Sequence, residues 1–357
     1  MSAPRLDAFF KQLCPSQAPG YAWSISSCSG RIAGGWGGST SLDAGSADIG
    51  ENTLFDLASL TKPLVTALVA LRASDTGELD LLEPVNGARP EPFTLLQLLR
   101  HEAGFPPWLP LYGMVQHQDQ AAPWLLSACP RSRPGLRATY SCLGYVLLGL
   151  LLQRKLGKPL DLLFSERVGI PLGLPQDAGC FNPPPRIKNR VAATERQAGN
   201  EANMARLYGA ITPEFLSDPD ARGVVNDGNA RFMGGVSGNA GFFGCLKAVE
   251  LLANAYRPER KFLSERSLDL AWRTAPGLPG EPRTAGWKAD HAPGWDAGAV
   301  LPLGSIGHEG YTGTAVYLEP GSGKTYALLT NRIHPRHPGT DFGPARASFL
   351  RLAREFA

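Results

Sequence analysis

The spacing of apolar and polar positions divides this chain into a middle part with helical periodicity and two ends with strand periodicity. Near the N-terminus, short alternating segments at residues 22–25, 31–36 and about 53–57 are separated by Gly- and Ser-rich turns. Such segments are typical of β-strands. From Ser59 to about residue 210, apolar runs of helical spacing dominate instead. The change of period predicts a sheet that begins before residue 60 and a largely helical segment after it.

Strand-like segments return from Gly234 onward. Strands at both ends with helices between them indicate an α+β fold, in which a sheet domain is interrupted by a helical insertion. We therefore predict a discontinuous sheet subdomain from residues 1–60 and 235–357, and a mostly helical insertion over residues 61–234. The helices expected in the C-terminal part cover about residues 263–273 and 344–356.

Length and composition indicate a large core and no strong charge bias. The chain has 357 residues, of which 43% are hydrophobic, so two subdomains or one large domain are expected. The formal net charge of +3 is too small to indicate a nucleic-acid partner. The cysteines are scattered without a C-x-x-C pair, and we expect buried reduced thiols. They are Cys14, Cys28, Cys129, Cys142, Cys180 and Cys245.

No segment has the pattern of a membrane span or a signal peptide. The longest apolar run, residues 143–152, is ten residues long and contains two glycines, which is too short to cross a bilayer. Residues 1–11 have no apolar core of signal-peptide length and read as a short amphipathic helix. We expect a cytoplasmic protein, or a periplasmic one if the N-terminus is incomplete. The sequence leaves the oligomeric state open.

The first candidate for chemistry is the pair Ser59 and Lys62, between an apolar approach and a buried helical run. Pro63 is tolerated only in a first turn, so the helix should begin near Ser59. Residues three apart share a helical face, which would place the Ser59 hydroxyl beside the Lys62 amine. Burial lowers the pKa of a lysine, and a neutral amine can accept the proton of a serine nucleophile. The alternative for Ser59 is a plain helix cap.

Two further segments carry chemical groups of the same kind. Tyr140 precedes an apolar helical run, where its phenol could transfer protons if a nearby ammonium lowers its pKa. The stretch 307–318 contains His308, Glu309 and Gly310 and ends in a strand-like alternation. Its glycines allow another backbone to approach closely.

These motifs resemble those of the serine β-lactamase and penicillin-binding protein superfamily, in particular its class C-like branch of D,D-peptidases and esterases. That superfamily orders its motifs S-x-x-K, then Y-x-N or a variant, then K-T-G or H-x-G. This chain has Ser59 with Lys62, then residues 140–142, then residues 308–310, in that order. The resemblance spans about residues 20–350. Similar stretches are also found at residues 98–106, 223–230, 238–243 and 329–335.

The resemblance implies a β-lactamase/transpeptidase-like fold, with a central antiparallel sheet flanked by helices and an all-helical subdomain. It places the active site between the two subdomains and implies acyl transfer as the reaction. Ser59 would attack a carbonyl, Lys62 and Tyr140 would move protons, and the acyl-enzyme would then be hydrolysed. The backbone N–H groups of Ser59 and Tyr311 would hold the oxyanion. No cofactor or metal is implied, and the partner would be a small-molecule or peptide substrate.

The departures from the superfamily pattern bear on that substrate. Cys142, His308, Glu309 and Gly310 would contact it. The family's peptidases and lactamases recognise a carboxylate near the third motif, where this chain has a partly charged histidine and a glutamate. Cys142 replaces an amide, and a thiol is a poor donor. We therefore favour a serine hydrolase of the esterase or amidase type. The alternatives are a D-Ala-D-Ala carboxypeptidase or β-lactamase, and a catalytically silent relative that binds peptides or muropeptides.

Several other features are interpreted structurally. Residues 321–325 resemble the end of a P-loop but precede a strand, which indicates a hairpin turn. His334 and His337 lack the helical frame of a metal pair, and no G-x-S-x-G motif is present. We expect His101 to anchor a loop by a hydrogen bond, and Asp227 and Asn229 to satisfy backbone groups in a turn. Three aromatic residues could line a cleft mouth or simply pack: Trp108, Tyr112 and Trp124.

Overall fold

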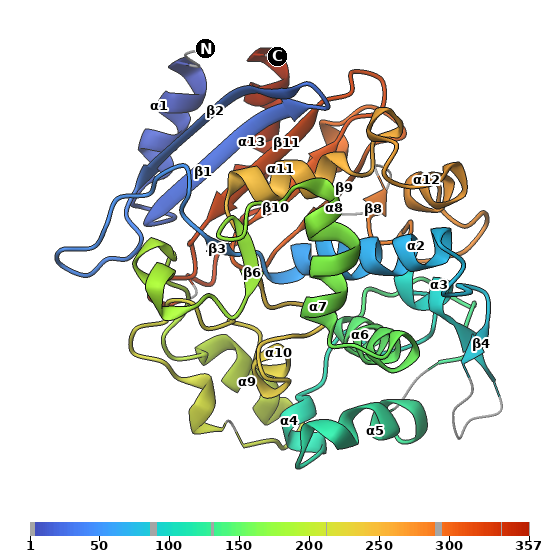
Figure 1. The fold of residues 1–357 in the computed structure, drawn as a ribbon. Helices are drawn as coiled ribbons and strands as arrows, with labels where there is room; N and C mark the ends of the chain where they lie inside the picture. The colour runs from blue at the N-terminus through green and yellow to red at the C-terminus, as the bar shows by residue number, and fades with distance from the viewer. Residues whose placement is uncertain are drawn as a thin grey trace.

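Segments from the two ends of the chain pair into one antiparallel sheet (Figure 1). The computed structural model describes residues 4–85, 91–129, 132–211, 213–289, 295–336 and 338–356. Within these ranges the sheet has six strands in the order β2-β1-β11-β10-β9-β8. The central pairs match Trp23 with Leu328 and Val316 with His308. The strands are β1 (Gly20–Ser27), β2 (Gly30–Gly38), β8 (Lys288–Ala289), β9 (Ile306–Glu309), β10 (Ala315–Leu318) and β11 (Thr325–Thr330).

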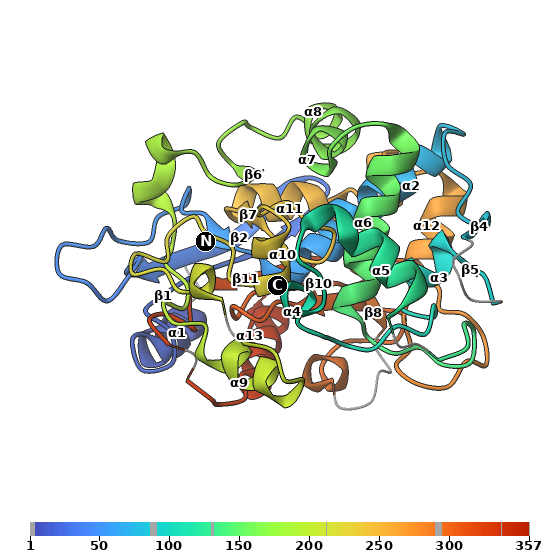
Figure 2. The same cartoon turned by 90° about the horizontal axis from the view of Figure 1, so that it is seen from below.

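The two faces of this sheet are covered by different helices, as Figures 1 and 2 show together. On one face lie α1 (Pro4–Leu13) and α13 (Gly343–Phe356), whose buried residues pack with alternate strand residues such as Trp23 and Tyr317. Phe10 of α1 stacks on Tyr21 at 4.4 Å between ring centroids. The other face packs against α11 (Leu246–Asn254) and the helical segment that carries Lys62. Side-chain alternation along the strands therefore supplies two separate apolar cores.

The middle of the chain is largely helical, and its centre is α6 (Cys142–Leu156). Nearly every residue from Leu143 to Leu152 is buried, which confirms that the longest apolar run is a core helix. Gly157 ends α6 in the left-handed conformation that glycine adopts without strain. The helices around it and in the rest of the chain are α2 (Leu68–Asp75), α3 (Leu95–Leu99), α4 (Leu111–Met114), α5 (Ala121–Ser127), α7 (Leu160–Phe164), α8 (Ile170–Leu172), α9 (Gly199–Leu207), α10 (Gly228–Phe232) and α12 (Glu265–Trp272).

Short strands join the helical part to the sheet part. β3 (Phe55–Asp56), β7 (Phe242–Gly244) and β6 (Gly179–Phe181) form a three-stranded sheet. β4 (Pro84–Val85) pairs with β5 (Phe93–Thr94). β3 leads directly into the turn that carries Ser59, so this small sheet fixes where that residue lies.

The predicted fold class is confirmed, and the interpretation of residues 321–325 holds because they form the hairpin between β10 and β11. All six cysteines are free thiols, but the expectation that they are buried is right only for Cys129 and Cys245, and the other four are partly exposed. His334 lies against the Thr194 carbonyl, and His337 lies outside the described residues. In the part of the chain that the structure describes, no helix combines the length and the apolar character needed to traverse a bilayer. The division into two subdomains remains a prediction.

Candidate active site

Ser59 lies in a 3-10 turn (Ala58–Leu60), which a π-helical turn (Lys62–Ala67) and α2 continue. The helical segment begins beside Ser59, as predicted from the position of Pro63. Ala58 has a positive φ of 47°, which a residue with a Cβ rarely adopts. Its backbone N–H donates to Asp56 Oδ1 at 2.8 Å, and this bond helps to hold the conformation. The strained turn presents the Ser59 hydroxyl at the edge of a cavity.

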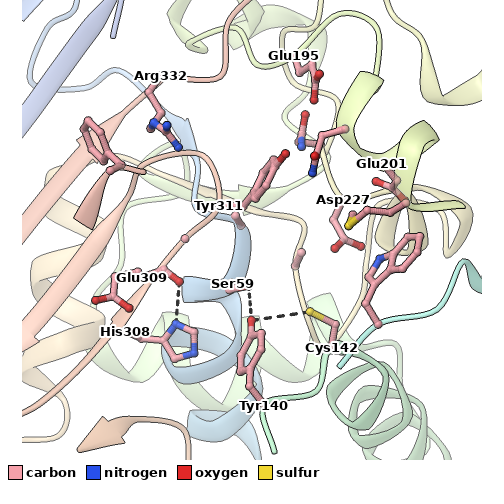
Figure 3. A pocket seen from close by; sticks show the side chains of 18 of the residues that line it. Ser59, Tyr140, Cys142, Glu195, Glu201, Asp227, His308, Glu309, Tyr311 and Arg332 are labelled. Atoms are coloured by element: carbon pink, nitrogen blue, oxygen red, sulfur yellow. Dashed lines mark hydrogen bonds between the residues drawn. The ribbon is translucent and has the colours of Figure 1, made fainter. Parts of the chain in front are cut away.

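Two side chains meet at the Ser59 hydroxyl: Lys62 from the same helical segment, and Tyr140 from a distant part of the chain, whose contact with Ser59 is visible in Figure 3. Ser59 Oγ lies 2.7 Å from the hydroxyl of Tyr140 and 3.0 Å from Nζ of Lys62. The same Nζ donates to the Asn239 carbonyl at 2.9 Å and lies 3.6 Å from Cys142 Sγ. The structure thus brings the expected nucleophile, Ser59, together with the two residues expected to move protons, and Cys142 lies beside them.

Burial shifts the pKa values of Lys62 and Tyr140 in opposite directions. Lys62 is fully buried, and desolvation lowers the pKa of its amine. Burial also raises the pKa of the Tyr140 phenol well above its ordinary value. The expectation that a nearby ammonium lowers the pKa of Tyr140 is therefore wrong, because desolvation outweighs the charges around it. The amine is the group that can accept a proton, and the phenol is the group that holds one.

Tyr140 is positioned by hydrogen bonds to the loop around His101. The Ser141 N–H donates to His101 Nδ1 at 3.0 Å, and the Thr139 N–H donates to the His101 carbonyl at 2.9 Å. Ser141 also caps α6 by accepting from the Gly144 N–H. His101 is thus the loop anchor that the sequence predicted.

A cation that the sequence did not single out lies on the other side of Tyr140. The guanidinium of Arg283 is 4.9 Å from the centroid of the Tyr140 ring, and it pairs with Glu281. Backbone bonds between Ala138 and residues 279–281 hold this segment beside Tyr140. Arg283 lies in a Gly- and Pro-rich stretch. This stretch has no periodic pattern of apolar residues, so the sequence could not identify Arg283 as a site residue.

His308 and Glu309 lie on β9, and their side chains point in different directions (Figure 3). Nδ1 of His308 lies 2.9 Å from the Glu309 carbonyl, so this nitrogen carries the proton. Burial lowers the pKa of His308 well below its ordinary value, and the charge of Arg283 adds to the effect. The ring is therefore neutral at neutral pH. The Glu309 carboxylate accepts from the Trp295 indole and lies 4.0 Å from Lys288 Nζ, away from Ser59.

The end of β9 is attached directly to the segment before Ser59. The hydroxyl of Thr312 donates to the Asp56 carbonyl at 2.7 Å, and that of Thr314 donates to the Leu57 carbonyl at 3.1 Å. A Cβ on Gly310 would lie 2.7 Å from the Leu57 carbonyl oxygen, so only glycine permits this approach. Tyr311, the expected oxyanion donor, follows Gly310 and lines the same cavity as Ser59.

The cavity has a volume of about 480 Å³, the size of a small-molecule site. Cys142, His308, Glu309 and Gly310 all line it. In Figure 3, Glu201 and Asp227 lie on the wall opposite His308. Trp108 lines the cavity as well, whereas Tyr112 and Trp124 pack into apolar clusters.

The roles expected for Asp227 and Asn229 are confirmed. Asp227 caps α10 by accepting from the Ala230 N–H, and the amide of Asn229 bonds the backbone of residues 109 and 111. Among the described residues, no group of three or more His, Cys, Asp or Glu side chains is arranged to hold a metal ion.

Asp56 is a site residue that the sequence analysis missed. It is buried, and its two carboxylate oxygens accept from the Ala58 N–H and the Asn226 N–H, both at 2.8 Å. Desolvation raises the pKa of Asp56 to about 6. The sequence offered one signal for Asp56, which is an ionisable residue inside the apolar stretch 54–60. An aspartate is almost never fully buried unless it is paired.

Comparison with known proteins identifies the family. The Beta-lactamase family model matches residues 6–349, and the chain belongs to this family, whose members are generally hydrolases, esterases or peptidases. A Bacillus subtilis (strain 168) protein named "N-acetylmuramyl-L-alanine amidase" is 30% identical over 313 residues, which cover 79% of this chain and 68% of the relative. An Escherichia coli (strain K12) "Putative D-alanyl-D-alanine carboxypeptidase" is 28% identical over 317 residues, covering 79% and 70%.

Solved structures share the fold at low sequence identity. "EstCE1, a hydrolase with promiscuous acyltransferase activity" matches with a TM-score of 0.76 and 19% identity, covering 98% of both chains. The octameric penicillin-binding protein homologue from Pyrococcus abyssi matches with a TM-score of 0.73 and 19% identity, covering 100% of this chain and 78% of the homologue. These structures confirm the β-lactamase/transpeptidase-like fold that the sequence motifs predicted, and the family model confirms the family.

Proposed function

We propose that the protein is a serine hydrolase that cleaves an ester or amide bond through an acyl-enzyme on Ser59. The observation that carries this proposal is the hydrogen-bonded group of Lys62, Ser59 and Tyr140 at the wall of a ligand-sized cavity. A nucleophile within hydrogen-bond reach of a base is the arrangement that activates a serine.

The geometry supports a definite division of roles. The lone pair of a neutral Lys62 amine accepts the Ser59 proton while one of its N–H groups donates to the Asn239 carbonyl. Ser59 Oγ then bonds to the substrate carbonyl carbon, and the N–H groups of Ser59 and Tyr311 hold the resulting oxyanion. The protonated Tyr140 phenol donates to the leaving group as the bond to it breaks. Water hydrolyses the acyl-enzyme by the reverse sequence of proton transfers.

The cavity favours an esterase or amidase over an efficient β-lactamase. His308 is neutral, so it gives no fixed positive charge to a substrate carboxylate. Cys142 offers a thiol where the family pattern has an amide, and a thiol is a weak hydrogen-bond donor. Uncharged ester and amide substrates do not depend on either contact.

A D-Ala-D-Ala carboxypeptidase is the second candidate, and one specific observation supports it. Arg283 and Lys288 line the cavity, so a carboxylate would find cations there other than His308. Glu309, which would otherwise repel a carboxylate, is held by Trp295 and Lys288. A silent binding protein is disfavoured, because the Ser59, Lys62 and Tyr140 contacts have no evident structural purpose in a protein that only binds.

The test compares the wild type with Ser59→Ala and with a matched control, Ser127→Ala, whose exposed hydroxyl bonds only the Pro123 carbonyl of its own helix. We expect hydrolysis of a short-chain p-nitrophenyl ester and an acyl adduct on intact-mass spectra in the wild type and the control, and neither in Ser59→Ala. Equal rates in all three proteins would contradict the proposal. D-alanine release from a pentapeptide without ester hydrolysis would favour the carboxypeptidase. No reaction and no adduct with either substrate would favour the silent binder.

A further inference from the structure

The β9–β10 turn (residues 310–314) is held by an arginine on the C-terminal helix. Arg346 lies in the first turn of α13. Its Nη2 donates to the Gly310 carbonyl at 2.7 Å and lies 3.4 Å from the Thr314 carbonyl. One guanidinium therefore bridges the two ends of the turn that contains Tyr311.

The Gly310 carbonyl and the Tyr311 N–H belong to the same peptide group. A cation that donates to a carbonyl draws electron density through the amide and makes the N–H at the other end a stronger donor. The bond also fixes the plane of the peptide, which decides where that N–H points. In the proposed reaction, this N–H is one of the two oxyanion donors.

We propose that Arg346 is a positioning residue for catalysis: its guanidinium orients and polarises the Gly310–Tyr311 peptide so that the Tyr311 N–H binds the oxyanion. This inference rests on the proposed acyl transfer at Ser59. It assigns a role in that reaction to a helix that lies on the opposite face of the sheet from α11 (Figure 2).

The contacts on both sides of the turn support this role. On the side of the nucleophile, Thr312 and Thr314 donate to the carbonyls of Asp56 and Leu57. On the other side, Arg346 holds the turn, and the Phe342 ring packs at 5.4 Å from its guanidinium. A turn held from two sides keeps a single orientation, which an oxyanion donor requires because its effect depends on distances of about 3 Å.

A competing role for Arg346 is direct binding of an anionic substrate, since its side chain also lines the cavity. The two roles differ for neutral substrates. A positioning residue acts on every substrate that forms an oxyanion, whereas an anion-binding residue acts only on charged ones. A neutral p-nitrophenyl ester therefore separates them.

The experiment measures ester hydrolysis and the infrared carbonyl band of the Ser59 acyl-enzyme in the wild type, Arg346→Met and Arg346→Gln. The control is Arg354→Met, on the same helix, where the guanidinium bonds the Val300 carbonyl and Glu319 away from the site. We expect Arg346→Met to lower kcat about tenfold with little change in KM, below the roughly hundredfold loss typical of removing a whole donor. The acyl carbonyl band should move to higher wavenumber, because its hydrogen bond weakens.

Arg346→Gln keeps an N–H donor without the charge, so it should show both effects at a smaller size; it also serves if the methionine variant does not fold. The inference would be overturned if either Arg346 variant folds and shows the same rates and the same carbonyl band as Arg354→Met. A defect confined to KM for anionic esters would overturn it as well. Absence of any Ser59 adduct in the wild type would overturn the proposed function and this inference together, whereas a normal wild-type adduct with unaffected Arg346 variants overturns the inference alone.

Discussion

In the proposed reaction, activation of Ser59 depends on the surroundings of Lys62. Lys62 has no exposed surface, and its amine donates to a backbone carbonyl, Asn239, which cannot neutralise a positive charge as a carboxylate would. Thr66 donates to the neighbouring Gly238 carbonyl and fixes that segment. Desolvation lowers the pKa of the amine, as the proposed role of Lys62 as a base for Ser59 requires.

The residue-scale prediction concerns the two proton carriers. Lys62→Ala and Tyr140→Phe should each lower kcat by about a hundredfold or more, since general acid–base groups contribute factors of this order. Stopped-flow measurement of p-nitrophenol release would report the acylation step for Lys62→Ala, and hydrolysis of an alkyl ester would report the loss in Tyr140→Phe. In Tyr140→Phe, a substrate whose leaving group needs no proton should lose less activity than an alkyl ester. A uniform loss across leaving groups would contradict the role of Tyr140 as proton donor.

The sequence predicted the residues whose relation is local or follows a known motif, and it missed those joined only by the fold. Ser59 and Lys62 are three residues apart, so helical geometry alone places them together. The bond from the Asn226 N–H to Asp56 joins positions 170 residues apart, and no periodicity encodes it. Arg283 reaches Tyr140 from an irregular stretch. The conformation of such loops is set by tertiary contacts, which local patterns do not contain.

At the scale of elements, the decisive feature is the contact between β9 and the turn before Ser59. Gly310 lies so close to the Leu57 carbonyl and to Thr314 that no side chain fits between them. The strand end and the nucleophile turn therefore behave as one unit. The position of Tyr311 relative to Ser59 depends on this contact rather than on either element alone.

The element-scale prediction is that Gly310→Ala lowers kcat/KM for a neutral ester by about a hundredfold, because displacement of a catalytic group by about 1 Å has an effect of this size. The matched control is Gly321→Ala, in the β10–β11 hairpin, where a Cβ would meet no atom within 4 Å. The variants are compared by ester hydrolysis and thermal unfolding. A Gly310→Ala protein with the activity of the control would show that the close approach is dispensable.

For the whole molecule, the fold class could be predicted because strand and helix periods occupy separate parts of the chain. The strands of the sheet come from residues 20–38 and 288–330, and the helices between them enclose α6. The order of strands within the sheet could not be predicted, because β1 pairs with β11 across the full length of the chain. That pairing brings α1 and α13 together, and it places Arg346 against the β9–β10 turn.

The stability of the whole protein should depend on pH through Asp56. Burial raises its folded pKa from the ordinary 3.8 to about 6, so the native protein binds this proton more tightly than the unfolded chain does. The resulting stabilisation is complete below about pH 4 and is lost as the pH rises through about 6. This difference in the pKa of Asp56 between the native and the unfolded protein corresponds to about 3 kcal/mol in the free energy of unfolding.

Asp56→Asn removes the titration, which makes the comparison specific. Between pH 4 and pH 7, the free energy of unfolding of the wild type should fall relative to that of Asp56→Asn by up to about 3 kcal/mol, as measured by chemical denaturation. The exposed Asp80, which caps a surface turn through the Leu82 N–H, provides the control Asp80→Asn. If the profiles of Asp56→Asn and Asp80→Asn both run parallel to that of the wild type, the carboxylate beside Ser59 is ionised throughout this range, and its two backbone bonds outweigh its burial.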